Sequence, residues 1–186
     1  MKARKTLLLV GLIVAAAAST SGGTRTAPTT SDSRPTRGPE RPATPYGADV
    51  LDLAGLPNVE FGDTEQELTQ RGVLGARGAS CASGLNGMEA VSPVFDHDRL
   101  VLLWADPPVR TPEGVTIGTP VSQVRATYPA LTRLTAPRGT YRFDGLLARD
   151  GDRAYLFLHD GRTVRKTVAG YAEYARRLFD EGFGTC

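Results

Sequence analysis

Two short stretches decide the fold of this chain: VEFGDT at Val59–Thr64 and VTIGTP at Val115–Pro120. Each stretch combines an apolar entry, a glycine that can turn the chain sharply, and residues suited to begin a helix. Gly62 and Gly118 lie 118 − 62 = 56 positions apart. We therefore predict two tandem repeats, each of which begins with a short helix.

The residues after each glycine predict where the two helices begin. Thr64 and Glu67 have the spacing of a capping box, in which side chain and backbone at the helix start bond reciprocally. Thr119 is the corresponding candidate cap, with Pro120 at the first helical position. The repeats should thus open in the same way.

A hairpin follows each predicted helix. The first pairs residues 89–95 with 100–105 around Asp96-His97-Asp98, and the second pairs 154–159 with 162–168 around the two-residue turn Asp160-Gly161. Asp96 and Asp160 lie 160 − 96 = 64 positions apart, so the hairpins recur as well. Residues 100–104 are apolar on both faces, as in a central strand, and residues 141–148 should add another strand.

The end of the chain predicts one longer helix at about residues 170–181. Its apolar face is formed by residues at helical spacing, and Gly182 can end it; the face comprises Tyr171, Tyr174, Ala175, Leu178 and Phe179. The predicted fold class is α+β: an antiparallel sheet with short packed helices, two tandem helix-plus-hairpin repeats (about 56–106 and 112–168) and a C-terminal helix.

The N-terminal residues read as a secretory signal peptide, residues 1–20, with cleavage between positions 18 and 23. Lys2, Arg4 and Lys5 precede the apolar run Leu7–Ala18, which is too short for a stable membrane span. Residues 21–46 are rich in Ser, Thr, Pro and Arg and predict a disordered spacer before a globular domain at 47–186. We expect a bacterial protein that is secreted or associated with the cell wall.

Charge argues against nucleic acid as a partner. Of the 22 Lys and Arg residues 7 precede Gly47, and of the 20 Asp and Glu residues 2 do, so the folded part carries 15 basic and 18 acidic side chains. A net charge of −3 is unlike the concentrated positive surface that phosphate contacts require.

The two cysteines, Cys81 and Cys186, predict an intramolecular disulfide, because exported proteins meet an oxidising environment. Motifs that bind phosphate, dinucleotides or calcium are absent from the sequence, and neither histidine has a partner at zinc-ligand spacing. We therefore predict no cofactor, no metal site and no catalytic residue.

Two functional hypotheses remain open. The first is a secreted, non-enzymatic module that binds an extracellular or cell-envelope protein, with a protein inhibitor as one version. The second is a small extracellular hydrolase or metal-dependent enzyme. It would use His97, which lies between Asp96 and Asp98, or His159, which precedes the Asp160-Gly161 turn.

The repeated apolar entry, Gly, cap and helix, followed by a hairpin, resembles one family of extracytoplasmic α+β repeats. This is the β-lactamase-inhibitor-like and outer-membrane-assembly small-lipoprotein group, and residues 61–68 and 111–124 carry the resemblance. It implies a small sheet packed by short helices and used for binding proteins. The chain departs from the pattern in lacking a lipoprotein cysteine and in having the long terminal helix.

Overall fold

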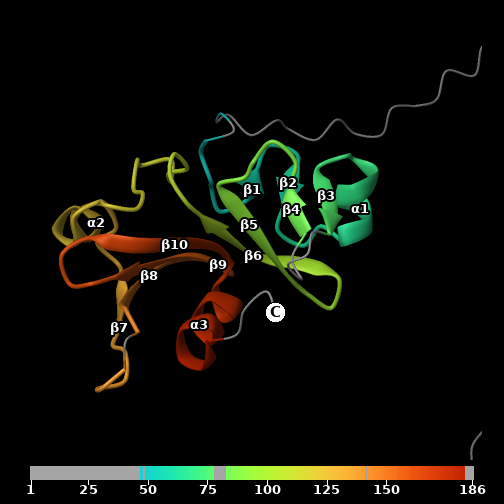
Figure 1. Cartoon of the computed structure of the whole chain (residues 1–186). Helices are drawn as coiled ribbons and strands as arrows, with labels where there is room; N and C mark the ends of the chain where they lie inside the picture. The colour runs from blue at the N-terminus through green and yellow to red at the C-terminus, as the bar shows by residue number, and fades with distance from the viewer. Residues whose placement is uncertain (1–46, 48, 78–82, 141, 183–186) are drawn as a thin grey trace, which may run out of the picture. The chain divides into compact units, whose positions relative to one another are not determined.

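The computed structural model describes residues 47, 49–77, 83–140 and 142–182. Its centre is a six-stranded antiparallel sheet with the strand order β5-β6-β10-β9-β8-β7 (Figure 1). These strands are β5 (Val91–Asp96), β6 (Arg99–Ala105), β7 (Thr132–Leu134), β8 (Asp144–Asp150), β9 (Arg153–His159) and β10 (Val164–Tyr171). The α+β class predicted from the sequence is confirmed.

The order of elements repeats along the chain. After a small hairpin of β1 (Gly55–Leu56) and β2 (Val59–Glu60) comes α1 (Glu65–Gln70), and four strands follow it. The first two of these strands, β3 (Leu74–Arg77) and β4 (Ser83–Leu85), form a separate two-stranded sheet. Helix α2 (Val121–Thr127) is likewise followed by four strands, all of them in the main sheet. Helix α3 (Ala172–Glu181) closes the described fold.

The registers of the two central hairpins match, including an irregularity. In β5–β6 the pairing passes from Val94↔Leu102 to Phe95↔Leu100, which leaves Val101 as an extra residue. In β9–β10 it passes from Leu158↔Lys166 to His159↔Val164, which leaves Arg165 extra. Since 165 − 101 = 64, the bulge recurs at the offset that separates the two hairpins.

The bulge explains why two adjacent apolar residues of the central strand β6, Val101 and Leu102, lie on the same face of the sheet. Side chains alternate across a strand, and one extra residue reverses that alternation. Leu100 and Leu103 consequently lie in one buried cluster, while Val101 and Leu102 lie in the other.

Strands β6 and β10 pair through the middle of the repeat. Trp104 lies opposite Val168, and 168 − 104 = 64, so Trp104 pairs with its own counterpart. An approximate twofold axis relating the two hairpins therefore passes close to this pair.

The two glycine corners join each helix to its hairpin in the same way. Gly62 donates its N–H to the carbonyl of Leu100, and Gly118 donates to that of Val164, each at 2.8 Å. Both glycines have positive φ, 97° and 92°, a region that side chains disfavour. This shared backbone is the physical basis of the repeated sequence pattern.

The helix starts differ between the repeats. The predicted capping box of Thr64 and Glu67 is present at α1. At α2 the predicted cap is wrong: Pro120 takes the N-cap position without a side-chain bond. The Thr119 hydroxyl instead accepts the N–H of Thr116 at 3.0 Å and so stabilises the glycine turn.

The second hairpin turn is longer than the two residues predicted. Strand β9 ends at His159 and β10 begins at Val164. The Asp160 carboxylate accepts the N–H groups of Arg162 and Thr163, each at 2.9 Å, and Thr163 also bridges to Pro120. These bonds hold the connecting residues outside the β9–β10 ladder.

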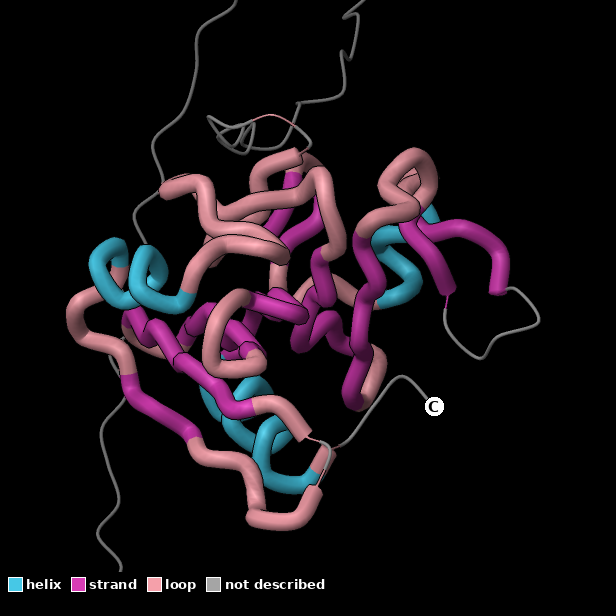
Figure 2. The backbone as a smooth tube through the Cα atoms, turned by 60° about the vertical axis from the view of Figure 1, so that its left-hand side comes forward, coloured by secondary structure: helices cyan, strands magenta, loops and turns pink. Residues whose placement is uncertain are grey.

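Each face of the main sheet has its own buried cluster. Figures 1 and 2 show α3 against one face, where it packs on β9 and β10 near Leu156 and Val168. The opposite face is covered by the N-terminal hairpin, α1 and α2, through buried residues such as Leu68 and Val124. The sheet is thus the middle layer of this unit.

Strands β5 and β7 form the two edges of the main sheet. Pro93 lies within β5, opposite Leu103 of β6, and β7 is only 3 residues long. Among the described residues, no helix combines the length and apolar character needed to span a bilayer. Several predictions concern residues outside the described ranges and stay predictions. They are the signal peptide, its cleavage region, the spacer at 21–46, and the disulfide between Cys81 and Cys186.

Candidate functional site

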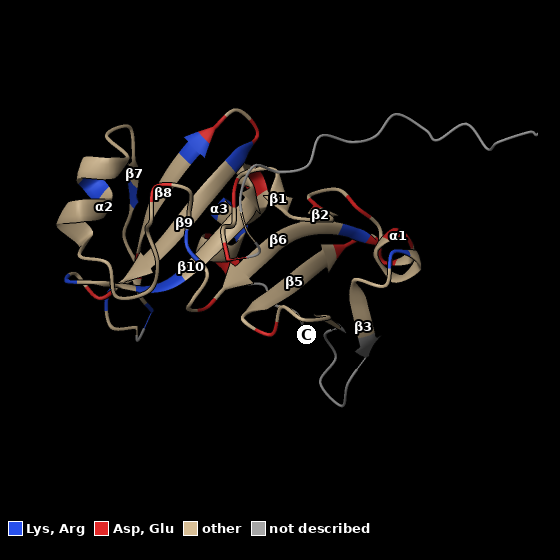
Figure 3. Cartoon of the chain, turned by 90° about the horizontal axis from the view of Figure 1, so that it is seen from above, with Lys and Arg blue, Asp and Glu red and all other residues tan. Residues whose placement is uncertain are grey.

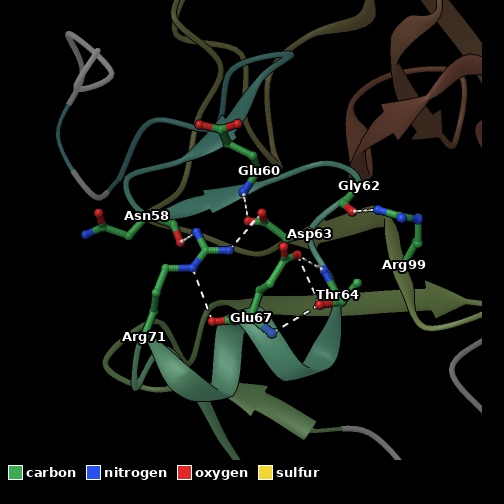
Figure 4. Close-up of polar contacts among 8 residues, drawn as sticks. All are labelled: Asn58, Glu60, Gly62, Asp63, Thr64, Glu67, Arg71 and Arg99. Carbon is green, nitrogen blue, oxygen red and sulfur yellow. Dashed lines mark hydrogen bonds and ion pairs between the residues drawn. The ribbon is translucent and has the colours of Figure 1, made fainter. Parts of the chain in front are cut away.

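A polar network surrounds the corner of the first repeat (Figure 4). The Asp63 carboxylate is 7% exposed; it accepts the N–H of Glu60 at 2.7 Å and pairs with the Arg71 guanidinium at 2.7 Å. Arg71 also donates to the carbonyls of Asn58 and Glu67, at 2.9 Å and 3.2 Å. The Arg71 contacts tie α1 to the preceding turn, and Arg99 of β6 donates to the Gly62 carbonyl at 2.8 Å and ties the same corner to the main sheet. The network therefore serves the fold.

His97 lies in the β5–β6 turn with positive φ, as does Asp98. Its side chain is 92% exposed, with Nδ1 3.1 Å from the Asp96 carboxylate. Tyr174 of α3 donates its hydroxyl to the same carboxylate at 2.8 Å, and it is the main cause, with His97 second, of a pKa of Asp96 below its ordinary value. Asp96 therefore fastens the turn to α3.

His159 lies at the end of β9, at the opposite end of its strand pair from Arg153. It is 5% exposed, and its Nδ1 accepts the N–H of Gly161 at 3.0 Å. Burial is the main cause of a pKa of the imidazole below its ordinary value. The ring is thus neutral at pH 7 and holds the turn together.

The two histidines belong to different turns and share no contact. Within the described ranges, no group of three or more His, Cys, Asp or Glu side chains could hold a metal ion. His97 contacts the carboxylate of Asp96, and His159 contacts the backbone of its own turn.

A groove lies on the α3 face of the sheet, next to the last turn of α3. It has a volume of about 340 Å³. Trp104 of β6, Lys166 of β10 and Leu158 of β9 contribute the sheet side, and the helix contributes Leu178 and Phe179. The remaining lining residues are Arg142, Phe143 and Gly182. The groove therefore lies between the last turn of α3 and the sheet.

The groove combines an apolar floor with a basic rim. Trp104 and Leu158 are half-buried, whereas Lys166 and Arg142 are exposed. Lys166 Nζ lies 5.3 Å from the centre of the Trp104 ring, and Arg142 Cζ lies 5.6 Å from that of Phe179. Figure 3 shows basic positions in blue on β10. Both cations are held against aromatic rings by cation–π contacts.

A second hollow, of about 370 Å³, lies on the opposite face of the sheet. Tyr128 and Tyr155 line it together with Asp52, Glu113 and Asp150. The Tyr128 hydroxyl donates to Glu113 and also lies 2.9 Å from the Thr111 hydroxyl, while Tyr155 donates to the Leu51 carbonyl at 3.1 Å. Burial, followed by the Glu113 bond, raises the pKa of Tyr128. The hydroxyl groups of both tyrosines are thus engaged in hydrogen bonds within the fold.

The sequence did not predict the groove. The sequence predicts Trp104 in a central strand and Phe179 on a helix face, and the structure places them in β6 and α3. Their convergence with Leu158 and Arg142 depends on strand order and on where α3 ends, which no local pattern encodes. The chain's one Trp and the one Lys after residue 46, Trp104 and Lys166, were the available signals.

Comparisons with known protein families, with curated proteins and with solved structures gave no match. The resemblance to the extracytoplasmic repeat group therefore rests only on the two quoted stretches. The fold and the groove have to carry the functional argument.

Proposed function

We propose that this chain is an exported, non-enzymatic binding module and that the groove beside Trp104 is its ligand-binding surface. One observation carries the proposal: half-buried apolar side chains from two strands and buried ones from one helix surround an open volume next to exposed cations. An apolar hollow with a few convergent polar groups is the usual form of a binding site. Export is the part of the proposal that rests on the N-terminal sequence alone.

The chemistry of the groove favours a binding function over an enzymatic one. In the described part of the chain its charged lining residues are Lys166 and Arg142, and no carboxyl group is among them. Such a surface can attract and orient a ligand but offers no general base at neutral pH. His97 and His159, the residues of the alternative hypothesis, do not line it.

Trp104 fluorescence offers a direct test, since it is the chain's one Trp. The full-length chain would be titrated with short peptides of varied apolar and charged content. We expect saturable changes in emission for some of them, and loss of those changes in Leu158→Asp. Leu53→Asp, a half-buried leucine in the second hollow, is the matched control and should keep binding. Binding that survives Leu158→Asp would refute the proposed site.

A further inference from the structure

We infer that the groove selects an extended segment of another protein in which an apolar side chain is flanked by acidic residues. This inference rests on the proposed function, because it names the partner chemistry of the same groove. Charge complementarity carries it, beginning with the state of the two rim cations.

Lys166 and Arg142 have no carboxylate partner among the described residues. Within the described ranges, the Arg142 side chain donates one hydrogen bond, from Nη1 to the carbonyl of Asp180 at 3.3 Å. Each cation instead lies against an aromatic ring that also lines the groove. Their charges are therefore held at the groove, and no described carboxylate neutralises them there.

The acidic residues nearest in sequence or pairing are already engaged elsewhere. Asp180 pairs with Arg176 at 2.6 Å, and Asp160 accepts two backbone N–H groups of its own turn. Asp144 accepts the N–H of Ala136 at 2.9 Å. An incoming carboxylate would thus meet two available cations beside an apolar surface.

The separation of the cations favours a chain segment over a compact anion. Lys166 is on β10 and Arg142 precedes β8, with β9 between them. Two strand spacings put their backbones roughly 10 Å apart or more. In an extended peptide, side chains at alternate positions point the same way and repeat at roughly 6.6 Å, so acids at the first and fifth positions span about 13 Å with an apolar residue between them.

The test uses three capped peptides with the full-length chain: Glu-Ser-Phe-Ser-Glu, the same peptide with Gln in place of Glu, and the same with Lys in place of Glu. Binding is measured by Trp104 fluorescence at low and at raised salt. We expect the acidic peptide to bind about tenfold more tightly than the Gln peptide, the Lys peptide to bind most weakly, and added salt to reduce the difference.

Variants assign the preference to the rim. Lys166→Met keeps an unbranched side chain that can lie on Trp104 and removes the charge, so it should lose most of the acidic preference while still binding the Gln peptide. Lys166→Glu should reverse the order of the acidic and Lys peptides. Arg165→Glu, an exposed neighbour that does not line the groove, is the matched control and should keep the wild-type order. Circular dichroism checks that each variant folds.

The outcomes separate this inference from the proposed function. Equal binding of all three peptides, abolished by Leu158→Asp, would keep the groove as a binding site and overturn the acidic preference. An acidic preference that survives both Lys166→Met and Arg142→Met would also overturn it, since the charge would then be recognised elsewhere. Absence of binding by any peptide would count against both proposals.

Discussion

The two halves of the described fold build the same backbone corner with different side chains. In the first half Asp63 accepts the N–H of Glu60, and in the second Thr119 accepts that of Thr116 at the equivalent position. Both side chains are buried, at 7% and 8% exposed, but only the carboxylate recruits a cation, Arg71. The turn requires a side-chain acceptor three residues after the donating N–H group. A negative charge on that acceptor is found only in the first half.

The halves also differ in where their first two strands go. Strands β3 and β4 form a sheet of their own, whereas β7 and β8 extend the main sheet beyond β9. This extension places Arg142 and Phe143, just before β8, beside α3 and so completes the groove. The repeat is therefore symmetric at its two central hairpins, but the groove forms only beside the strands that the second half adds to the sheet.

Removing the acceptor at each corner should give the largest difference between the halves. Asp63→Ala leaves Arg71 without its carboxylate and a backbone N–H without its acceptor, and we expect a loss of about 2–4 kcal/mol in the free energy of unfolding. Thr119→Ala removes one neutral hydrogen bond and should cost about 1 kcal/mol. Urea unfolding of both variants measures this difference.

A double variant sharpens the same test. Asp63→Thr combined with Arg71→Gln gives the first corner the neutral chemistry of the second, and it should recover much of the loss seen in Asp63→Ala. If Asp63→Ala and Thr119→Ala cost the same, the ion pair contributes nothing beyond the acceptor, and the contrast between the halves is only one of sequence.

The corner glycines should show a smaller difference. Gly62→Ala and Gly118→Ala each force a side chain into positive φ, at about 1–2 kcal/mol. A Cβ at position 62 would also lie 2.9 Å from the Tyr171 hydroxyl, while nothing lies within 4 Å of one at position 118. We therefore expect Gly62→Ala to lower the thermal midpoint further. In the Tyr171→Phe background the two substitutions should lower the thermal midpoint equally. A difference that persists there would come from the backbone and not from the Tyr171 hydroxyl.

The smallest expected difference between the halves is in the pH dependence of stability. It comes from His159 in the second half, whose counterpart in the first half is Phe95. The imidazole has a pKa of about 6.5 in an unfolded chain and a lower pKa in the folded one. Below pH 6.5 the unfolded state then binds more protons, so stability should fall as the pH drops from 6.5 toward 5. His159→Phe should flatten the curve in that window, above the range where carboxyl groups titrate.

His97→Asn is the control for this measurement. It removes the other histidine, which is exposed, and Asn tolerates the positive φ of the turn. Comparing the two variants separates the contribution of the buried ring from that of the exposed one. A flat wild-type curve between pH 6.5 and 5, or an equal change in both variants, would contradict the role given to buried His159.

The sequence predicted those parts of the fold that local chemistry determines. Gly62, Gly118 and the capping box of Thr64 can be recognised in the sequence, because a positive φ and the unpaired N–H groups at a helix start each require particular residues. The predicted helix cap at Thr119 is wrong because a hydroxyl can cap either a helix or a turn, and only the fold decides between them. The separate course of β3–β4 and the meeting of Trp104 with Phe179 depend on distant pairings that no short pattern specifies.

Pro93 in β5 affects how readily the sheet could aggregate with other chains. An open sheet offers free backbone groups along its outer strands, where a foreign strand can add and begin aggregation. A proline cannot donate to such a strand, so the β5 side is a poor template, and at the other side β7 offers a stretch of only 3 residues. The sheet is open in topology but protected against growth at both margins.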